Sequence, residues 1–207
     1  MNTLGSGEAR EQFLQMAVRM GQIKLPDTLA AGEKQAAAQA INNILLAARD
    51  DIVKSYPDYK NDVRMLSIYG LFYNGIGDAT HAEEVLKAAH AIAPHKQLVS
   101  FDLIRAYLLG QKFPDAYALG RETYDLSIIC HDALKWYVIS AAYAGQYKEA
   151  RDYALSKGQD PGIDPDIISG VINSGQKSLA IELLQELKKK DPSGAGAVSN
   201  CLIYAST

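Results

Sequence analysis

The sequence predicts an all-α fold built as a succession of antiparallel helix pairs. Apolar residues recur at helical spacing along the whole chain, and no segment shows the sustained alternation of a half-buried strand. After the first quarter of the chain, turn residues separate short segments at regular distances. Short helices joined by such turns pack against their chain neighbours as antiparallel pairs.

The first expected elements are longer than the later ones. A helix is expected over residues 8–20, and an alanine-rich helix over residues 28–54, with Asp27 as its cap. Pro57 is expected to end this second helix, because proline disfavours helical backbone in the residue before it. Turns are then expected at residues 75–78, 94–95, 110–111, 145–146, 158–165, 175–176 and 191–192.

Part of the sequence repeats with a period of 34 residues. Ala82, Ala116 and Ala150 are spaced 34 residues apart, and so are Tyr73 and Tyr107. In a helix pair, an aromatic ring on the first helix fills the space between the helices, and a small residue on the second lets the backbones approach. No pair buries its apolar face alone, so pairs are expected to stack. A helical bundle with accidental periodicity is the alternative.

Four repeats follow this pattern. Their matching residues are Leu66, Tyr69, Gly70, Tyr73, Ala82, Leu86, Ala89 and Pro94; Ser100, Leu103, Ile104, Tyr107, Ala116, Gly120 and Thr123; Trp136, Ile139, Ser140, Tyr143 and Ala150; and Val171, Gly175, Ala180, Leu184, Leu187 and Pro192. The pattern resembles the tetratricopeptide repeat (TPR). The resemblance covers about residues 61–192 and implies a right-handed α-solenoid of helix pairs with a concave inner wall.

The predicted domain organisation follows from these repeats. Residues 1–7 are expected to be disordered or derived from an expression linker, residues 8–60 to form an N-terminal helical pair, and residues 193–207 to form a capping helix or tail. The TPR-like repeats between them are expected at about 61–96, 97–130, 131–160 and 161–192.

Composition and charge exclude several classes of function. The 207 residues are 48% hydrophobic and 22% charged, which is ordinary for a globular protein, and the net charge of −3 gives no footprint for nucleic acid. No signal peptide and no membrane insertion by this chain are expected. Cys130 and Cys201 are expected to be buried free thiols.

The sequence predicts no catalytic residue, no metal site and no cofactor, so the protein is not expected to be an enzyme. The histidines at 81, 90, 95 and 131 are interpreted as surface residues, because none has a partner at metal-ligand spacing. Asp164 and Pro165 are interpreted as the cap and first residue of a helix rather than as part of a calcium loop.

The TPR resemblance implies a binding surface on the concave wall. Residues two, five, nine and twelve of each repeat point into it in that family. The binding residues that this implies are Arg64, Ser67, Leu71, Asn74, Phe101, Arg105, Leu108 and Tyr137, with Leu98, Leu134 and Ala141 at the remaining positions. The expected ligand is a protein or peptide segment with some acidic character. Alternatively, Phe101 and Tyr137 pack against neighbouring repeats.

A wider pattern combines the segment REQFLQMAVRM (10–20), a turn broken by proline, a long helix, and the segments RMLSIYGLFYNGIGD (64–78) and AEEVLKAAHAIAPHKQ (82–97). This pattern resembles the C-terminal repeat region of bacterial O-antigen ligase-like membrane proteins, mainly over residues 10–115. The resemblance implies an alternative function as a soluble accessory domain of an envelope glycan-transfer protein. The expected location is then the extracytoplasmic face of the membrane, and the cytoplasm if the chain is the whole protein. Self-association through an uncapped solenoid end is a further expectation.

Overall fold

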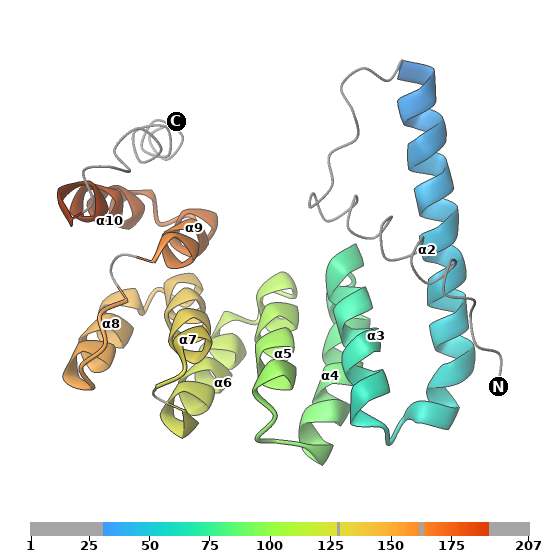
Figure 1. Ribbon diagram of the computed structural model, residues 1–207, viewed down its shortest axis with the longest axis horizontal. Helices are drawn as coiled ribbons and strands as arrows, with labels where there is room; N and C mark the ends of the chain where they lie inside the picture. The colour runs from blue at the N-terminus through green and yellow to red at the C-terminus, as the bar shows by residue number, and fades with distance from the viewer. Residues whose placement is uncertain (1–30, 128, 162–163, 191–207) are drawn as a thin grey trace. The chain divides into compact units, whose positions relative to one another are not determined.

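The computed structural model describes residues 31–127, 129–161 and 164–190, and within these ranges every regular element is a helix. The predicted all-α class is therefore confirmed. The expected helix over residues 8–20, the leading residues 1–7, the segment 193–207 and Cys201 lie outside the described residues. The helices are α2 (Ala31–Tyr59), α3 (Val63–Ile76), α4 (Ala79–Ile92), α5 (Gln97–Leu109), α6 (Phe113–Leu126), α7 (His131–Tyr143), α8 (Tyr147–Ser156), α9 (Pro165–Asn173) and α10 (Lys177–Lys190) (Figure 1).

Helices that follow one another in the chain are in contact at α2–α3, α3–α4, α5–α6, α6–α7, α7–α8 and α9–α10. Of these contacts, α3–α4, α5–α6, α7–α8 and α9–α10 each fall within one of the four predicted repeat ranges, whereas α6–α7 joins the second range to the third. The chain divides into two compact units, Met1–Ala93 and Pro94–Thr207, which are called unit 1 and unit 2 below. In unit 2, α7 also contacts both α5 and α9. The first helices of successive predicted repeats therefore touch one another there.

In unit 1, α3 and α4 pack closely. Gly70 on α3 has no room for a side chain, because an added Cβ would overlap the side chain of Leu86 on α4. The ring of Tyr73 stacks on His81 of α4, with ring centroids 5.1 Å apart. Asp62 and Asp78 cap the two helices by accepting hydrogen bonds from backbone N–H groups of the first turn. The aromatic and small residues of the first repeat thus lie at the helix contact.

The prediction that Pro57 ends the long helix is wrong by two residues. Helix α2 continues through Pro57 to Tyr59. Proline lacks the N–H that would bond the carbonyl four residues earlier, which interrupts a helix, and here the helix ends within two residues of that interruption.

The core of unit 2 contains a stack of tyrosines between α6 and α7. Tyr137 on α7 lies against Tyr124, with centroids 5.2 Å apart and planes at 8°, and against Tyr117, with centroids 5.7 Å apart and planes at 14°. Gly120 on α6 allows this approach, since an added Cβ would lie 3.2 Å from the Cα of Tyr137 and 2.5 Å from Ser140 Oγ. The stack fixes how α6 and α7 pack. Cys130, which precedes α7, is half-buried and free.

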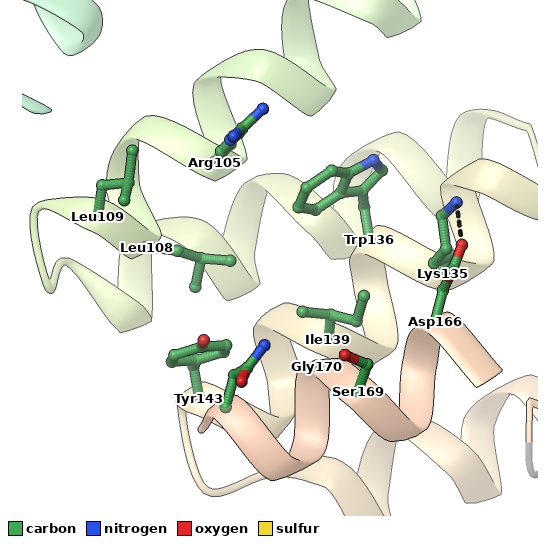
Figure 2. Close-up of a pocket in the computed structure, with 11 residues that line it drawn as sticks. Arg105, Leu108, Leu109, Lys135, Trp136, Ile139, Tyr143, Asp166, Ser169 and Gly170 are labelled. Atoms are coloured by element: carbon green, nitrogen blue, oxygen red, sulfur yellow. Dashed lines mark hydrogen bonds and ion pairs between the residues drawn. The ribbon is translucent and has the colours of Figure 1, made fainter. Parts of the chain in front are cut away.

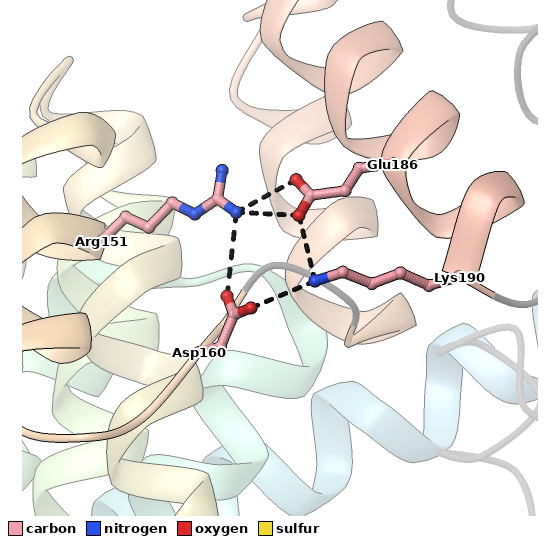
Figure 3. A network of polar contacts seen from close by, with 4 residues as sticks. All are labelled: Arg151, Asp160, Glu186 and Lys190. Carbon is pink, nitrogen blue, oxygen red and sulfur yellow. Dashed lines mark hydrogen bonds and ion pairs between the residues drawn. The ribbon is translucent and has the colours of Figure 1, made fainter.

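A helix cap and a network of charged side chains hold helices α9 and α10 in place. Asp164 caps α9 by accepting a hydrogen bond from the N–H of Asp166, with Pro165 at the first helical position, so the predicted cap is confirmed. A four-residue ion network connects α8, the loop that follows it and α10 (Figure 3). It comprises Arg151, Asp160, Glu186 and Lys190, with Arg151 Nη2 at 3.0 Å from Glu186 and 3.8 Å from Asp160.

Candidate binding groove

Three helices of unit 2 line an open groove with a volume of about 430 Å³ (Figure 2). These are α5, α7 and α9, which are the first helices of three successive predicted repeats. We call this surface the α5–α7–α9 groove. Its lining residues are Arg105, Leu108 and Leu109 from α5, Lys135, Trp136, Ile139 and Tyr143 from α7, and Asp166, Ser169, Gly170 and Asn173 from α9.

Helical spacing explains why these side chains share one surface. On each helix the lining residues are mostly three or four positions apart, as in Trp136, Ile139 and Tyr143. Residues at that spacing lie on the same face of an α-helix. Since α7 contacts both α5 and α9, the three faces adjoin. The groove is thus a product of how the pairs stack.

Close packing of α9 on α7 forms the middle of the groove. An added Cβ on Gly170 would lie 2.7 Å from Cγ1 of Ile139, so only glycine lets the two helices approach this far. At one end, Gln176 after α9 donates a hydrogen bond to the carbonyl of Ala142 on α7. At the other, His131 Nε2 lies 2.5 Å from Oδ2 of Asp164. Contacts at three levels therefore hold α9 beside α7.

The apolar part of the groove is aromatic and aliphatic. Trp136, Ile139 and Tyr143 are half-buried, so each keeps part of its surface accessible to a ligand. Tyr143 leans on Phe113 of α6, with centroids 5.4 Å apart, and burial raises the pKa of its hydroxyl. The ring therefore stays neutral at physiological pH and offers an apolar face.

The charged side chains of the groove differ in their pairing. Lys135 Nζ lies 3.2 Å from Asp132 and 3.2 Å from Asp166. Partial burial alone would lower the pKa of Lys135, but hydrogen bonds to these two carboxylates outweigh it, and the pKa is raised. The ammonium is therefore charged and neutralised locally. Burial raises the pKa of Asp102 on α5, and the nearby charge of Arg105 offsets only part of that rise.

The predicted site residues of unit 2 fall into three groups. Arg105 and Leu108 line the groove, as the repeat positions imply. Phe101 and Tyr137 are buried in the core of unit 2, which is the packing alternative stated for them, and Leu134 and Ala141 are buried too. Exposed Leu98 does not line the groove.

Four predicted site residues lie on α3 in unit 1. Arg64 and Leu71 are exposed, Ser67 is half-buried and donates a hydrogen bond to the carbonyl of Val63, and Asn74 is buried. Since they belong to the other compact unit, the structure does not place them in the α5–α7–α9 groove. Their role in binding remains a prediction.

Sequence reasoning missed most of the groove. Trp136, Ile139 and Tyr143 matched the repeat pattern and were interpreted as packing residues. Their spacing of three and four was a signal that they share one face of α7, and they contribute to both packing and groove. The residues on α9 carried no signal, because the fourth repeat matches the pattern only weakly.

Comparison with known proteins leaves the family open: no protein-family model and no curated protein sequence matches this chain. Among the described residues, no helix has the length and apolar character needed to cross a membrane. Over the same part of the chain, no cluster of three or more histidine, cysteine or acidic side chains is arranged to hold a metal ion.

Proposed function

We propose that this protein is a non-enzymatic interaction module of the TPR type, which binds a segment of another protein in the α5–α7–α9 groove. In this proposal the helix pairs of unit 2 are antiparallel and stack as a right-handed solenoid, with the first helices on the concave side. The observation that carries the proposal is that three successive first helices contribute one continuous lining to the groove.

The types of side chain support a protein ligand. Tryptophan, tyrosine and arginine dominate the binding energy of protein interfaces, and Trp136, Tyr143 and Arg105 all line this groove. A volume of about 430 Å³ suits a few anchoring side chains rather than a folded domain. An extended or helical segment that inserts two or three apolar residues is the ligand that this surface fits best.

The groove offers little for catalysis. Its acid–base candidates, Lys135 and Asp166, are paired with each other at 3.2 Å, and Ser169 is exposed on the helix surface. A nucleophile needs an adjacent general base within hydrogen-bond reach, and no such hydrogen bond to Ser169 occurs among the described residues. These features favour binding over reaction.

The alternative is a soluble accessory domain of an O-antigen ligase-like glycan-transfer protein. Trp136 stands near the polar side chains of Asp166, Ser169 and Asn173, a combination that also suits a sugar ring. Binding of a bacterial oligosaccharide in preference to any peptide would favour this alternative.

A matched pair of leucines tests the proposed groove. Leu109 lines the groove and is 44% exposed, whereas Leu155 on α8 lies outside it and is 45% exposed. Peptides are selected from a random displayed library against the full chain, synthesised, and titrated against Leu109→Ser and Leu155→Ser. Loss of affinity in the first variant only is expected. Equal affinity for both variants and the unmodified protein would overturn the groove assignment.

A further inference from the structure

Two positively charged side chains line the α5–α7–α9 groove, and they differ in the number of carboxylates that contact them. Lys135 lies within 3.2 Å of two carboxylates, those of Asp132 and Asp166. Arg105 forms no ion pair and no hydrogen bond through its guanidinium within the described part of unit 2. In Figure 2 the ring of Trp136 is drawn between Arg105 and the Lys135–Asp166 pair. Of these two cations, Lys135 is therefore in direct contact with carboxylates, and Arg105 has no ion pair in this part of the chain, although Asp102 lies near it on α5.

We propose that Arg105 is the specificity-determining residue of the groove and selects a carboxylate on the bound protein segment. This inference rests on the proposed function. The partner is a segment that carries a carboxyl group next to an aliphatic or aromatic side chain. The carboxyl group pairs with Arg105, and the apolar side chain lies on Leu108, Trp136 and Ile139.

The chemistry of arginine favours this ligand. A guanidinium presents its N–H donors in a planar fork that matches the two oxygens of a carboxylate, and it is charged at every physiological pH. Arg105 is half-buried, so part of its side chain is already packed and loses less freedom when the head group binds. The carboxyl of Asp102, one turn earlier on α5, lies near enough to interact with Arg105, and burial raises the pKa of that carboxyl and so disfavours its charged form.

The two carboxylates beside Lys135 determine the orientation of the ligand. A second acidic group placed near Lys135 would meet the carboxylates of Asp132 and Asp166, which already neutralise the ammonium. Like charges repel, and this penalty discriminates between binding orientations. The acidic group of the partner is therefore directed to the α5 side of the groove.

The experiment compares peptide selections against the full-length protein and three variants. The variants are Arg105→Gln, Arg105→Glu and, as the matched control on the other cation, Lys135→Gln. Circular dichroism checks that each variant keeps its helix content. The unmodified protein is expected to enrich peptides with an Asp, Glu or free terminal carboxylate beside an apolar residue. Arg105→Glu is expected to enrich Lys or Arg at that position, and Lys135→Gln to leave the preference unchanged.

Titration of one synthetic peptide from the selection measures how much each variant changes the affinity. Arg105→Gln is expected to weaken binding about tenfold, the value of one charge-assisted hydrogen-bonded contact. Replacing the acidic residue of the peptide by glutamine should cause the same loss, and the two losses should not add. An amidated form of the peptide separates the two sources of the carboxylate, because only a terminal carboxylate is removed by amidation.

The possible failures are distinguishable. Peptides that bind in a manner sensitive to Leu109→Ser, but show no acidic preference or keep it in Arg105→Gln, would overturn the role of Arg105 and leave the proposed function standing. Loss of the acidic preference in Lys135→Gln would also overturn the role of Arg105. Failure to select any peptide, or binding of an oligosaccharide alone, would overturn the proposed function and the assignment to Arg105 together.

Discussion

Gly170 on α9 and Ile139 on α7 are in contact at a point where both residues line the groove. A Cβ on Gly170 would lie 2.7 Å from Cγ1, 3.0 Å from Cγ2 and 3.1 Å from Cδ1 of Ile139, so three carbons of one side chain enclose the position. Glycine is a poor residue for the middle of a nine-residue helix. The close approach of the two helices explains why it is tolerated.

Gly170→Ala is therefore expected to destabilise the protein despite its better helix propensity. Overpacking in a filled contact costs about 1–3 kcal/mol, and the propensity gain returns about 1 kcal/mol. The net loss should be about 1 kcal/mol, measured by urea unfolding. The control is Ser169→Ala, an exposed neighbour on the same helix, which should be neutral or slightly stabilising. A stabilised Gly170→Ala variant would show that Ile139 moves aside freely.

Removing the hydroxyl of Tyr124 is expected to leave stability unchanged or raise it slightly. The Tyr124 hydroxyl is buried without a hydrogen-bond partner in the described part of the chain, and burial raises its pKa, so it stays protonated. Tyr124→Phe keeps the ring and removes a polar atom that gains nothing from burial. The free energy of unfolding should fall by less than about 0.5 kcal/mol, or increase.

The matched control for this change is Tyr153→Phe. The Tyr153 hydroxyl donates a hydrogen bond to Asp125 over 2.7 Å, so its removal should lower the free energy of unfolding by about 0.5–1 kcal/mol. A larger loss in Tyr124→Phe than in Tyr153→Phe would mean that the buried hydroxyl is satisfied after all.

The small residues of the repeat should not accept a larger side chain. Ala116 on α6 is fully buried, and Ala118, two residues along the same helix, is exposed. Ala116→Leu should overpack the contact and lower the free energy of unfolding by about 1–3 kcal/mol, whereas Ala118→Leu should change it by less than about 0.5 kcal/mol. Thermal unfolding monitored by circular dichroism measures both. Equal stability of the two variants would contradict the assigned packing role.

The repeat period predicted which residues lie at helix contacts, because those contacts join helices that are neighbours in the chain. Ala82, Ala116 and Ala150 are all fully buried. The same period predicted less of the groove. A repeat position gives the direction of a side chain from its helix axis, but not how far the neighbouring helices cover it. Tyr137 has a groove position in the repeat, yet Tyr117 and Tyr124 of α6 enclose its ring.

The residues on the α9 side of the groove could not be predicted from the sequence, for a different reason. The fourth repeat lacks the aromatic residue of the other first helices, so the sequence gives no register for its groove face. That face depends on the Gly170–Ile139 contact between helices far apart in the chain. Whether a carboxylate lies within ion-pair distance of Arg105 depends likewise on which acidic residues fold beside it, and the repeat pattern does not contain that information.

The ion network around Glu186 should make stability depend on pH in a defined direction. A hydrogen bond from Lys190 lowers the pKa of Glu186; burial acts against this, and Arg151 lowers the pKa further. The lowered pKa means that the folded state binds a proton less readily than the unfolded state. Its contribution to stability is therefore fully present above the unfolded-state value of about 4.5, and is lost as the pH falls through the folded-state pKa.

Glu186→Gln tests this dependence, with Glu182→Gln as the control. Glu182 is exposed on the same helix and forms no ion pair within the described residues. At about pH 7 Glu186→Gln should unfold at lower urea concentration than the unmodified protein, and the gap should close as the pH falls below about 4.5. Added salt should also reduce the difference in stability between Glu186→Gln and the unmodified protein, because the side chains of Arg151, Glu186 and Lys190 are partly exposed. A gap that stays constant with pH would assign the loss to packing of the Glu186 stem, since packing does not titrate.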